Sequence, residues 1–210
     1  MRVKICGITT ERGLAGAVEA GADAVGFVSG FASSRRNIPL RKAAELIHLV
    51  PPFVQSVLVT NREMLSSHRD EIQAADPDAI QLYGNGVRRA DRELTRALLI
   101  RPHFVGGTAD PSAEVEGADA LLTTSHGVAS PGGTGQPPDL GLCSDLRRRI
   151  SPFPLILSGG LKPGTVGSAI ACVRPYAVDV SSGVESSPGV KDWVMMARFV
   201  KNAREAEDSA

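Results

Sequence analysis

The stretch from Leu155 to Glu185 decides the fold of this chain. It reads LILSGG (155–160), LKPGTVGSAIACV (161–173) and, after Arg174-Pro175, YAVDVSSGVE (176–185). Two apolar runs each end in small residues, and a helical segment separates them. Neighbouring strand ends rich in Gly and Ser present several backbone N–H groups to one anion, and the next helix N-terminus adds partial positive charge. Either turn alone could simply reverse the chain, but the tandem arrangement favours a phosphate site.

The composition narrows the classes of partner. The chain has 210 residues, with 23 basic and 23 acidic side chains, which argues against a nucleic-acid partner held by charge. Its three cysteines, Cys6, Cys143 and Cys172, show no CxxC or Cys/His ligand spacing, so we expect no metal site and no disulfide framework. No apolar run approaches the ~20 residues of a membrane span, and no signal peptide is evident. These features predict a cytoplasmic protein without a membrane segment.

Strand and helix patterns alternate along the whole chain. Apolar runs predict strands at 3–6, 24–28, 54–59, 79–82, loosely within 98–105, at 120–124, and at the two runs quoted above. Helical spacing predicts helices at 12–20, 40–49, 61–75, 87–99, 140–149, 161–173 and 191–207. Strand then helix, about eight times over, implies parallel strands with right-handed crossovers.

This alternation predicts an α/β protein with a single (β/α)8 TIM barrel domain spanning residues 1–210. Because 210 residues is short for this fold, one or two helices should be short or missing. A doubly wound open sheet is the alternative. It is disfavoured because no GxGxxG follows the first strand, and because the tandem Gly/Ser turns follow the last two strands, where barrels commonly hold phosphate.

Candidate site residues lie where the predicted strands end, because barrel active sites form there. Cys6 ends the first strand and could act as a base or nucleophile; a small buried hydrophobe is the alternative. Arg36 could pair with a carboxylate or phosphate, or could belong to a solvated basic loop. Gln81 and Asp179 are polar residues in apolar strands, so each should have a ligand or a hydrogen-bond partner.

The remaining candidates share the same predicted face of the barrel. Tyr83 follows Gln81, Thr124 ends the sixth strand, and His126 lies two residues further on. A GGTG loop (132–135) contributes Gly133 and Gly135. The candidate phosphate-binding residues are Gly159, Gly160, Ser182 and Gly183.

With these motifs in place, the chain resembles the phosphoribosylanthranilate isomerase family of tryptophan biosynthesis almost end to end. The matching segments are KICGIT (4–9), GADAVGFV (21–28), the loop ending at Arg36, AIQLYG (79–84), GGTG (132–135), LSGGLKP (157–163) and AVDVSSGVESSPGVKD (177–192). The resemblance implies an Amadori rearrangement, converting N-(5-phosphoribosyl)anthranilate into 1-(o-carboxyphenylamino)-1-deoxyribulose 5-phosphate. It also implies a phosphorylated small-molecule substrate and no metal or cofactor, and we expect a monomer or a homodimer.

The resemblance also assigns roles. It makes Cys6 the base, places Arg36 on the anthranilate carboxylate and gives Asp179 a role in positioning the ribose or the reacting centre. The Gly/Ser turns at 159–160 and 182–183 would hold the phosphate, while Gln81, Tyr83 and the GGTG loop would contact the rest of the substrate.

Two positions depart from the family. ALLTTS (120–125) places Thr124 where the family has a general-acid aspartate, in a motif like ALLLDS, and Tyr83 replaces the usual histidine. A threonine hydroxyl is a poor proton donor, and a lost acid typically costs ~10²–10⁴-fold in rate. His126 could replace it, because its ordinary pKa suits acid catalysis near neutrality.

Three functions remain open. The chain could be a working isomerase with a relocated acid, which we favour. It could instead be a family member recruited to a related phosphoribosyl or aromatic-amine substrate in specialised metabolism. It could also be a ligand-binding protein without catalysis, although retention of Cys6, Arg36 and Asp179 argues against this.

Overall fold

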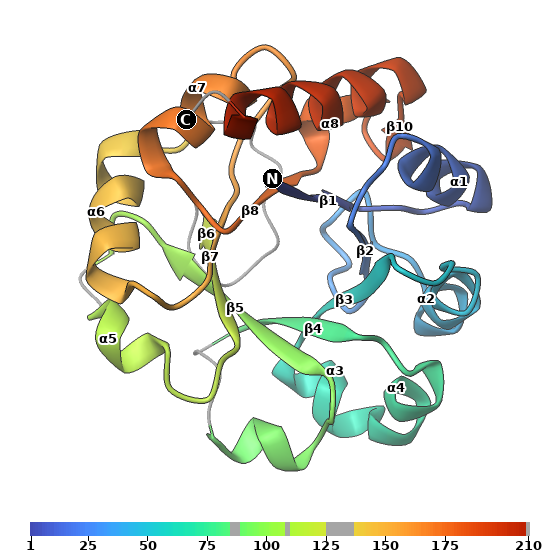
Figure 1. Cartoon of the computed structure of the whole chain (residues 1–210). Coiled ribbons are helices and arrows are strands. Elements are labelled where there is room, and N and C mark those ends of the chain that lie inside the picture. The colour runs from blue at the N-terminus through green and yellow to red at the C-terminus, as the bar shows by residue number, and fades with distance from the viewer. Residues whose placement is uncertain (85–88, 108–109, 125–136, 209–210) are drawn as a thin grey trace.

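Eight parallel strands close into a barrel in their order along the sequence (Figure 1). The computed structural model describes residues 1–84, 89–107, 110–124 and 137–208. The strands are β1 (Arg2–Cys6), β2 (Ala24–Val28), β3 (Gln55–Asn61), β4 (Ala79–Tyr83), β5 (Leu98–Phe104), β6 (Ala120–Thr124), β7 (Leu155–Leu157) and β8 (Ala177–Val180). Strand β1 pairs with β8, with Lys4 opposite Asp179, and this pairing closes the barrel. The predicted (β/α)8 fold is confirmed.

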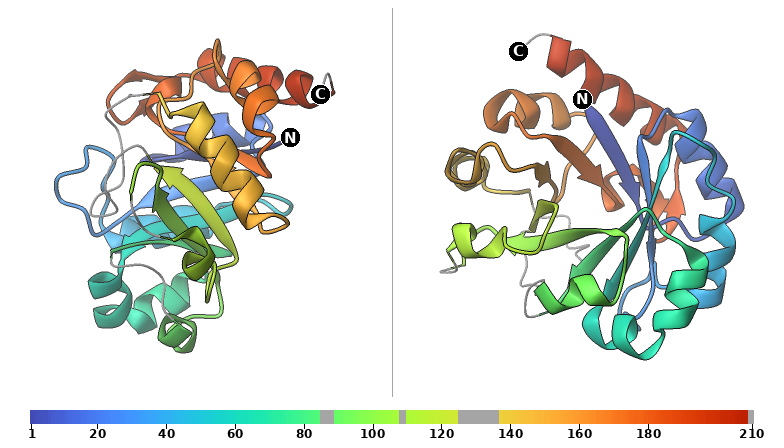
Figure 2. Two further views of the ribbon diagram at one scale, coloured as in Figure 1. Left: turned by 90° about the vertical axis from the view of Figure 1, so that its left-hand side faces the viewer. Right: turned by 60° about the horizontal axis from the view of Figure 1, so that its bottom comes forward.

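Helices surround the barrel on the outside, as two further views show (Figure 2). They are α1 (Glu11–Glu19), α2 (Leu40–Ile47), α3 (Arg62–Ser67), α4 (Arg69–Ala75), α5 (Pro111–Glu114), α6 (Leu140–Ile150), α7 (Val166–Val173) and α8 (Trp193–Asp208). Two 3₁₀ helices, η1 (Arg89–Glu93) and η2 (Ser182–Val184), complete the set among the described residues. Helix α5 has a single turn, which agrees with the expectation that some barrel helices are short.

Side-chain caps start several of these helices. Asn61 caps α3, accepting a hydrogen bond from the Met64 N–H at 2.9 Å. Thr10 caps α1 in the same way, and Asp139 caps α6. Gly21 ends α1 with a φ of 86°, the left-handed conformation that glycine adopts without steric cost.

Some predicted elements were wrong in detail. The helix predicted at 61–75 is two helices, because the backbone leaves helical geometry at His68, with φ −122° and ψ 35°. The helix predicted at 87–99 is wrong: within the described residues this segment forms the five-residue η1, and β5 already begins at Leu98. Helix α7 starts at Val166 because residues 162–165 form a turn, in which the Thr165 N–H donates to the Lys162 carbonyl.

A short antiparallel hairpin lies after β8 and was not predicted. Its strands are β9 (Glu185–Ser187) and β10 (Val190–Lys191), and Gly189 turns the chain between them with a φ of 86°. The hairpin precedes α8, which begins close to the predicted boundary and ends with the described chain. It brings Glu185 and Lys191 together near the open end of the barrel.

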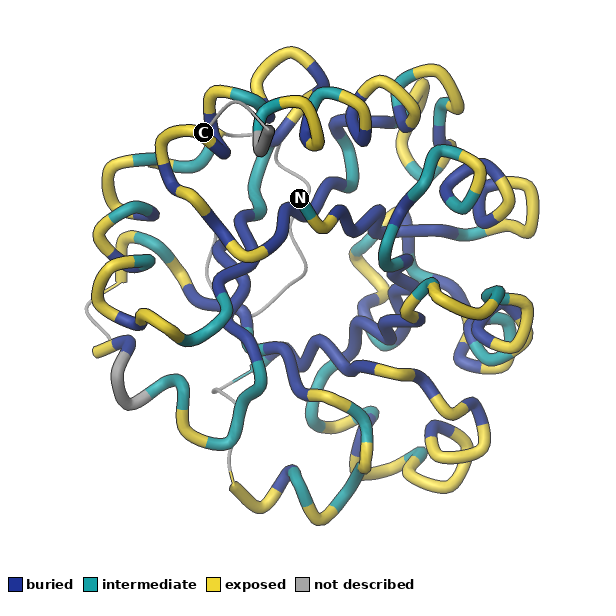
Figure 3. Tube along the Cα trace, in the orientation of Figure 1, coloured by how far each residue is buried: buried dark blue, intermediate teal, exposed yellow. Residues whose placement is uncertain are grey.

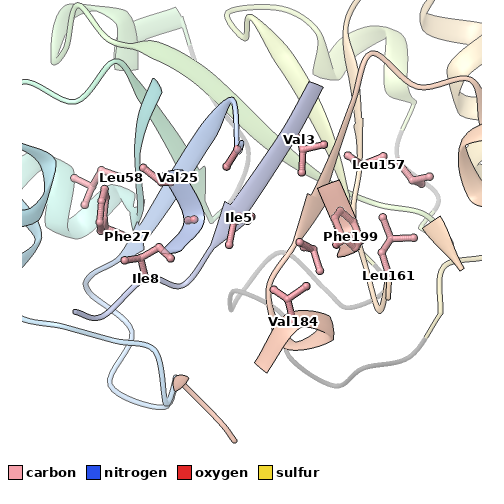
Figure 4. Packing of buried hydrophobic residues seen from close by; sticks show 14 of the residues in the cluster. Val3, Ile5, Ile8, Val25, Phe27, Leu58, Leu157, Leu161, Val184 and Phe199 are labelled. Carbon is pink, nitrogen blue, oxygen red and sulfur yellow. The ribbon is translucent and has the colours of Figure 1, made fainter. Parts of the chain in front are cut away.

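The core has two layers because side chains alternate along each strand. Outward-facing residues such as Ile5, Phe27 and Leu157 pack against the helices, together with Phe199 of α8 (Figure 4). A smaller inner cluster fills the barrel and consists of Val57, Ala79, Ile100, Ala120, Leu122, Ile156 and Ala177. The strands are mostly buried and the outer faces of the helices are exposed (Figure 3). Among the described helices, none is long and apolar enough to cross a membrane.

Candidate active site

One cavity opens at the carboxyl ends of the barrel strands and collects most of the predicted site residues. Those lining it are Cys6, Arg36, Gln81, Tyr83, Thr124, Gly159, Gly160, Asp179, Ser182 and Gly183. These residues come from strands or loops in every part of the sequence, so the closed barrel is what brings them together. His126, Gly133 and Gly135 lie outside the described residues.

A buried lysine connects the polar residues of the barrel interior. The Lys4 Nζ donates to Asp179 Oδ1 at 2.8 Å and to Gln81 Oε1 at 3.0 Å, and Lys4 is only 4% exposed. The network continues on both sides. The Ser158 Oγ donates to Asp179 Oδ2 at 3.1 Å, and the Gln81 Nε2 donates to the Tyr83 hydroxyl at 3.2 Å. The partner expected for Gln81 and Asp179 is therefore Lys4.

Sequence reasoning missed Lys4, although the sequence carried a signal. In VKIC (3–6), Val3 and Ile5 face the helices, so Lys4 and Cys6 share the inner side of β1. A charged residue on the inner side of a buried strand needs a charged partner. The strand order of a closed barrel places β8 beside β1, which makes Asp179 that partner.

The thiol of Cys6 faces the cavity in a strongly charged environment. Burial raises the pKa of Cys6 above its ordinary value, and Asp179 adds to this, while Lys4 and Lys191 act in the opposite direction. The neutral thiol is thus the resting form. Gly26 gives the sulfur its space, because a Cβ at this position would lie 2.7 Å from the Cys6 Sγ.

Arg36 reaches the cavity from the loop between β2 and α2, and its guanidinium is held by Glu185. Its Nε and Nη2 donate to the Glu185 Oε1 and Oε2 at 2.7 and 2.6 Å. The Lys191 Nζ donates to the same Oε1 at 2.7 Å. Burial alone would raise the pKa of Glu185, but the hydrogen bonds and charges of Arg36 and Lys191 lower it below its ordinary value. Glu185 is therefore ionised.

The Arg36–Glu185–Lys191 cluster carries one net positive charge, because two cations meet one anion. Arg36 Nη1 has no hydrogen-bond partner within the described chain and remains available to a ligand. The alkyl part of Arg36 passes over Gly7, where a Cβ would lie 2.5 Å from Arg36 Cδ. The cluster is thus suited to a single carboxylate at the mouth of the cavity.

The Gly/Ser turns after β7 and β8 also line the cavity. Gly183 approaches the preceding loop so closely that a Cβ would lie 1.8 Å from the Leu161 carbonyl oxygen. Gly159 and Gly160 have φ angles of 106° and 59°, and their N–H groups donate to no other described residue. These two donors lie beside the cavity, as an anion site requires.

Thr124, the last residue of β6, lies 5% exposed in the cavity wall. The neighbouring Thr123 holds the wall in place, because its Oγ1 donates to the Ser158 carbonyl and accepts from the Ser158 N–H, at 2.9 and 2.7 Å. Within the described residues, no three His, Cys, Asp or Glu side chains gather as a metal site would need.

The fold and this cavity define a (β/α)8-barrel protein with an enzyme-like site at the carboxyl ends of its strands. A family model described as "PRAI: N-(5'phosphoribosyl)anthranilate (PRA) isomerase" matches residues 3–202. The N-(5'-phosphoribosyl)anthranilate isomerases of Halorubrum lacusprofundi and Pseudomonas putida are 41% and 38% identical, each comparison covering 98% of both chains.

Solved structures agree. Phosphoribosylanthranilate isomerase from Thermotoga maritima superposes with a TM-score of 0.83 at 37% identity, covering 98% of this chain and 99% of that one. A complex of such an isomerase with reduced 1-(o-carboxyphenylamino)-1-deoxyribulose 5-phosphate superposes with a TM-score of 0.81 at 37% identity, with the same coverage of both chains. The chain belongs to the N-(5'-phosphoribosyl)anthranilate isomerase family, and it is an isomerase. The family resemblance seen in the sequence is confirmed.

Proposed function

We propose that this chain catalyses the Amadori rearrangement of N-(5-phosphoribosyl)anthranilate to 1-(o-carboxyphenylamino)-1-deoxyribulose 5-phosphate. Its full-length similarity to isomerases of this name supports the reaction. The observation that carries the proposal is one cavity lined by the Cys6 thiol, by Arg36 of the cationic cluster and by Gly159 and Gly160, whose N–H groups donate to no other described residue. The thiol can take a proton from a C–H bond, the cationic cluster can bind a carboxylate, and the N–H groups can bind a phosphate.

The two charged ends of the substrate define its orientation. In the proposal, the N–H groups of Gly159 and Gly160, with the turn at Ser182 and Gly183, bind the phosphate. Nη1 of Arg36 binds the anthranilate carboxylate, whose negative charge neutralises the cluster with Glu185. The ribose then lies between these ends, over Cys6 and Asp179. Gln81, Tyr83, Gly133 and Gly135 are proposed to contact the rest of the substrate.

The chemistry needs one acid and one base. An acid protonates the furanose ring oxygen, the C1–O bond breaks, and the nitrogen lone pair forms a Schiff base. The thiolate of Cys6 then takes the proton from C2, and the electron pair moves towards nitrogen to give an enolamine. Proton transfer to C1 and loss of the proton on the C2 oxygen yield the ketone.

The identity of the acid separates the possible functions. Thr124 lies in the cavity wall where the family resemblance places an aspartate, and a hydroxyl with a very high pKa supplies protons poorly. We propose that His126 provides the proton. Recruitment to a related aromatic-amine phosphate substrate is the second candidate, because the Thr124 substitution changes the acid position while the anion-binding walls remain.

We also propose that the enzyme works in the cytoplasm, without a cofactor, as a monomer or a homodimer; a solved relative is described as dimeric.

Complementation tests the proposal. A bacterial tryptophan auxotroph lacking the isomerase receives the wild-type chain, Cys6→Ala, His126→Ala or Thr124→Asp. We expect growth with wild type, loss of growth with Cys6→Ala and strongly reduced growth with His126→Ala. Growth with Thr124→Asp but not with wild type would overturn the proposal and favour recruitment. Unchanged growth with His126→Ala would exclude His126 as the acid.

A further inference from the structure

Lys4 is the feature of the barrel interior that the proposed chemistry leaves unexplained. It is buried on the inner side of β1, and it is not among the residues that line the cavity. A buried Lys–Asp pair adds little net stability, since well-packed apolar residues in its place are often equally stable or more stable. The barrel interior already contains such apolar packing, in the inner cluster that includes Val57 and Ile156. A functional reason for the ammonium is therefore expected.

The geometry connects Lys4 with Cys6. Two residues apart on one strand, they lie on the same side, and the Lys4 side chain extends through the barrel interior to reach Asp179 and Gln81. These bonds use two of the three ammonium protons. The charge of the ammonium also acts on the Cys6 thiol and favours its ionised form. Burial acts to lower the pKa of Lys4, but Asp179 and Cys6 raise it above its ordinary value, so Lys4 stays charged.

We propose that Lys4 is a positioning residue whose ammonium stabilises the thiolate of Cys6 and neutralises Asp179 next to it. This inference rests on the proposed role of Cys6 as the base. Without the ammonium, the carboxylate of Asp179 would face the thiolate directly, and two negative charges would meet in a buried site. Lys4 thereby counteracts the burial and the Asp179 charge that raise the pKa of Cys6.

The other charged or titratable groups around Cys6 are less suited to this task. They are Asp179 on β8, Lys191 on β10, Arg36 on the loop after β2, and Tyr83 on β4. Lys191 and Arg36 are both bonded to Glu185, which takes up part of their charge. Burial raises the pKa of Tyr83 well above its ordinary value, so its hydroxyl stays neutral. Asp179 opposes ionisation of the thiol, and Lys4 counteracts it.

This electrostatic role predicts opposite effects of two substitutions. Lys4→Met removes the cation and leaves Asp179, so the pKa of Cys6 should rise. Asp179→Asn removes the anion and leaves Lys4, so the pKa should fall. A purely structural role would loosen the same site in both variants and give changes of the same sign.

The test is the pH dependence of Cys6 alkylation by iodoacetamide, with the modified residue assigned by mass spectrometry. Cys172 is exposed and would also react, so all variants carry Cys172→Ser; Cys143 is buried, and burial raises its pKa to about 12. We expect the alkylation midpoint to shift up by at least about one pH unit in Lys4→Met and down in Asp179→Asn. The acidic limb of kcat/KM should move in the same directions.

Two further variants guard against misfolding. Lys4→Arg keeps the charge and should retain the reference midpoint, whereas Lys4→Met/Asp179→Asn is neutral at both positions and should return close to it. A folded Lys4→Met protein with an unchanged or lower midpoint would overturn the proposal, as would an unchanged or higher midpoint in Asp179→Asn. If the midpoints shift as expected but the reference protein does not isomerise the substrate, the proposed function fails and the role of Lys4 stands.

Discussion

Glu185 fixes the guanidinium of Arg36, so its substitution tests how Arg36 is held. Glu185→Gln replaces the carboxylate with a neutral amide. The amide cannot accept the hydrogen bonds from Arg36 Nε, Arg36 Nη2 and the Lys191 ammonium together, and it lacks the negative charge that strengthens them. We expect KM to rise by about tenfold, equivalent to ~1.4 kcal/mol of binding free energy, with a smaller effect on kcat. Steady-state kinetics measure KM and kcat of this variant. The control is Glu45→Gln, which changes an exposed residue in a surface ion pair. An unchanged KM would contradict the role of Glu185.

The individual residues also show what sequence reasoning could reach. Cys6, Arg36 and Asp179 were predictable because their reactive or charged side chains lie at predicted strand ends or within motifs that match the family. Lys4 and Glu185 were not singled out, because each acquires meaning only from its partner. Lys4 lies 175 residues from Asp179 in sequence, and Glu185 lies 149 residues from Arg36. Barrel closure and the hairpin after β8 create these pairs.

The loops after β7 and β8 fit together through Gly183, which suggests a test with a matched control. A Cβ at Gly183 would lie 1.8 Å from the Leu161 carbonyl oxygen, so the backbone must move. We expect Gly183→Ala to lower the free energy of unfolding by about 2 kcal/mol, typical of overpacked sites, and to weaken binding of inorganic phosphate. Denaturant unfolding and calorimetric titration measure the two effects.

Gly164 is the control for this substitution. It lies in the turn before α7, and a Cβ there meets nothing within 4 Å. Gly164→Ala should leave phosphate affinity unchanged and alter stability by less than about 1 kcal/mol. Equal losses in both variants would mean that the close contact at Gly183 does not hold the two loops together.

Among the elements, strands were predicted better than helices. The β strands are buried apolar runs with clear ends, so most boundaries fell within a few residues. Strand β5 was placed only loosely within 98–105; it includes Pro102, which is paired opposite Leu122 of β6. The helix predicted at 87–99 failed because tertiary contacts decide this segment: Arg62 binds Asp91, and Arg92 binds Asp119 across η1. The hairpin of β9 and β10 was too short to leave a periodic signal.

We expect the stability of the barrel against acid to depend partly on a cluster of charged side chains on its outer side. Glu114 of α5 contacts Arg101 and His103 of β5. Burial acts to raise the pKa of Glu114, but the hydrogen bonds and charges of His103 and Arg101 lower it below its ordinary value of 4.5. A lowered carboxyl pKa stabilises the fold above the unfolded-state pKa, and this stability is lost as pH falls through the folded-state pKa.

Glu114→Gln should therefore destabilise the protein at pH 7 and make its stability less dependent on pH below about 4.5. Thermal unfolding at several pH values between neutral and acidic conditions measures both. If wild type and Glu114→Gln lost stability in parallel on acidification, the carboxylate of Glu114 would not be responsible for the acid sensitivity.

For the whole molecule, alternation of strand and helix predicted a closed barrel because parallel strands joined by short crossovers have few other arrangements. Closure places the first strand against the last, and this contact assembles Lys4, Cys6 and Asp179. We propose that residues 1–210 form one domain, which should unfold in a single transition.

Turnover of N-(5-phosphoribosyl)anthranilate by the purified chain tests the central claim most directly. The assay compares wild type with Cys6→Ala and, as the control, Cys172→Ala, which changes an exposed cysteine away from the cavity. We predict measurable turnover by wild type and by Cys172→Ala, and a ~10²–10⁴-fold lower kcat in Cys6→Ala, because the base is removed. A folded wild-type protein without turnover, or a Cys6→Ala variant as fast as wild type, would contradict the claim.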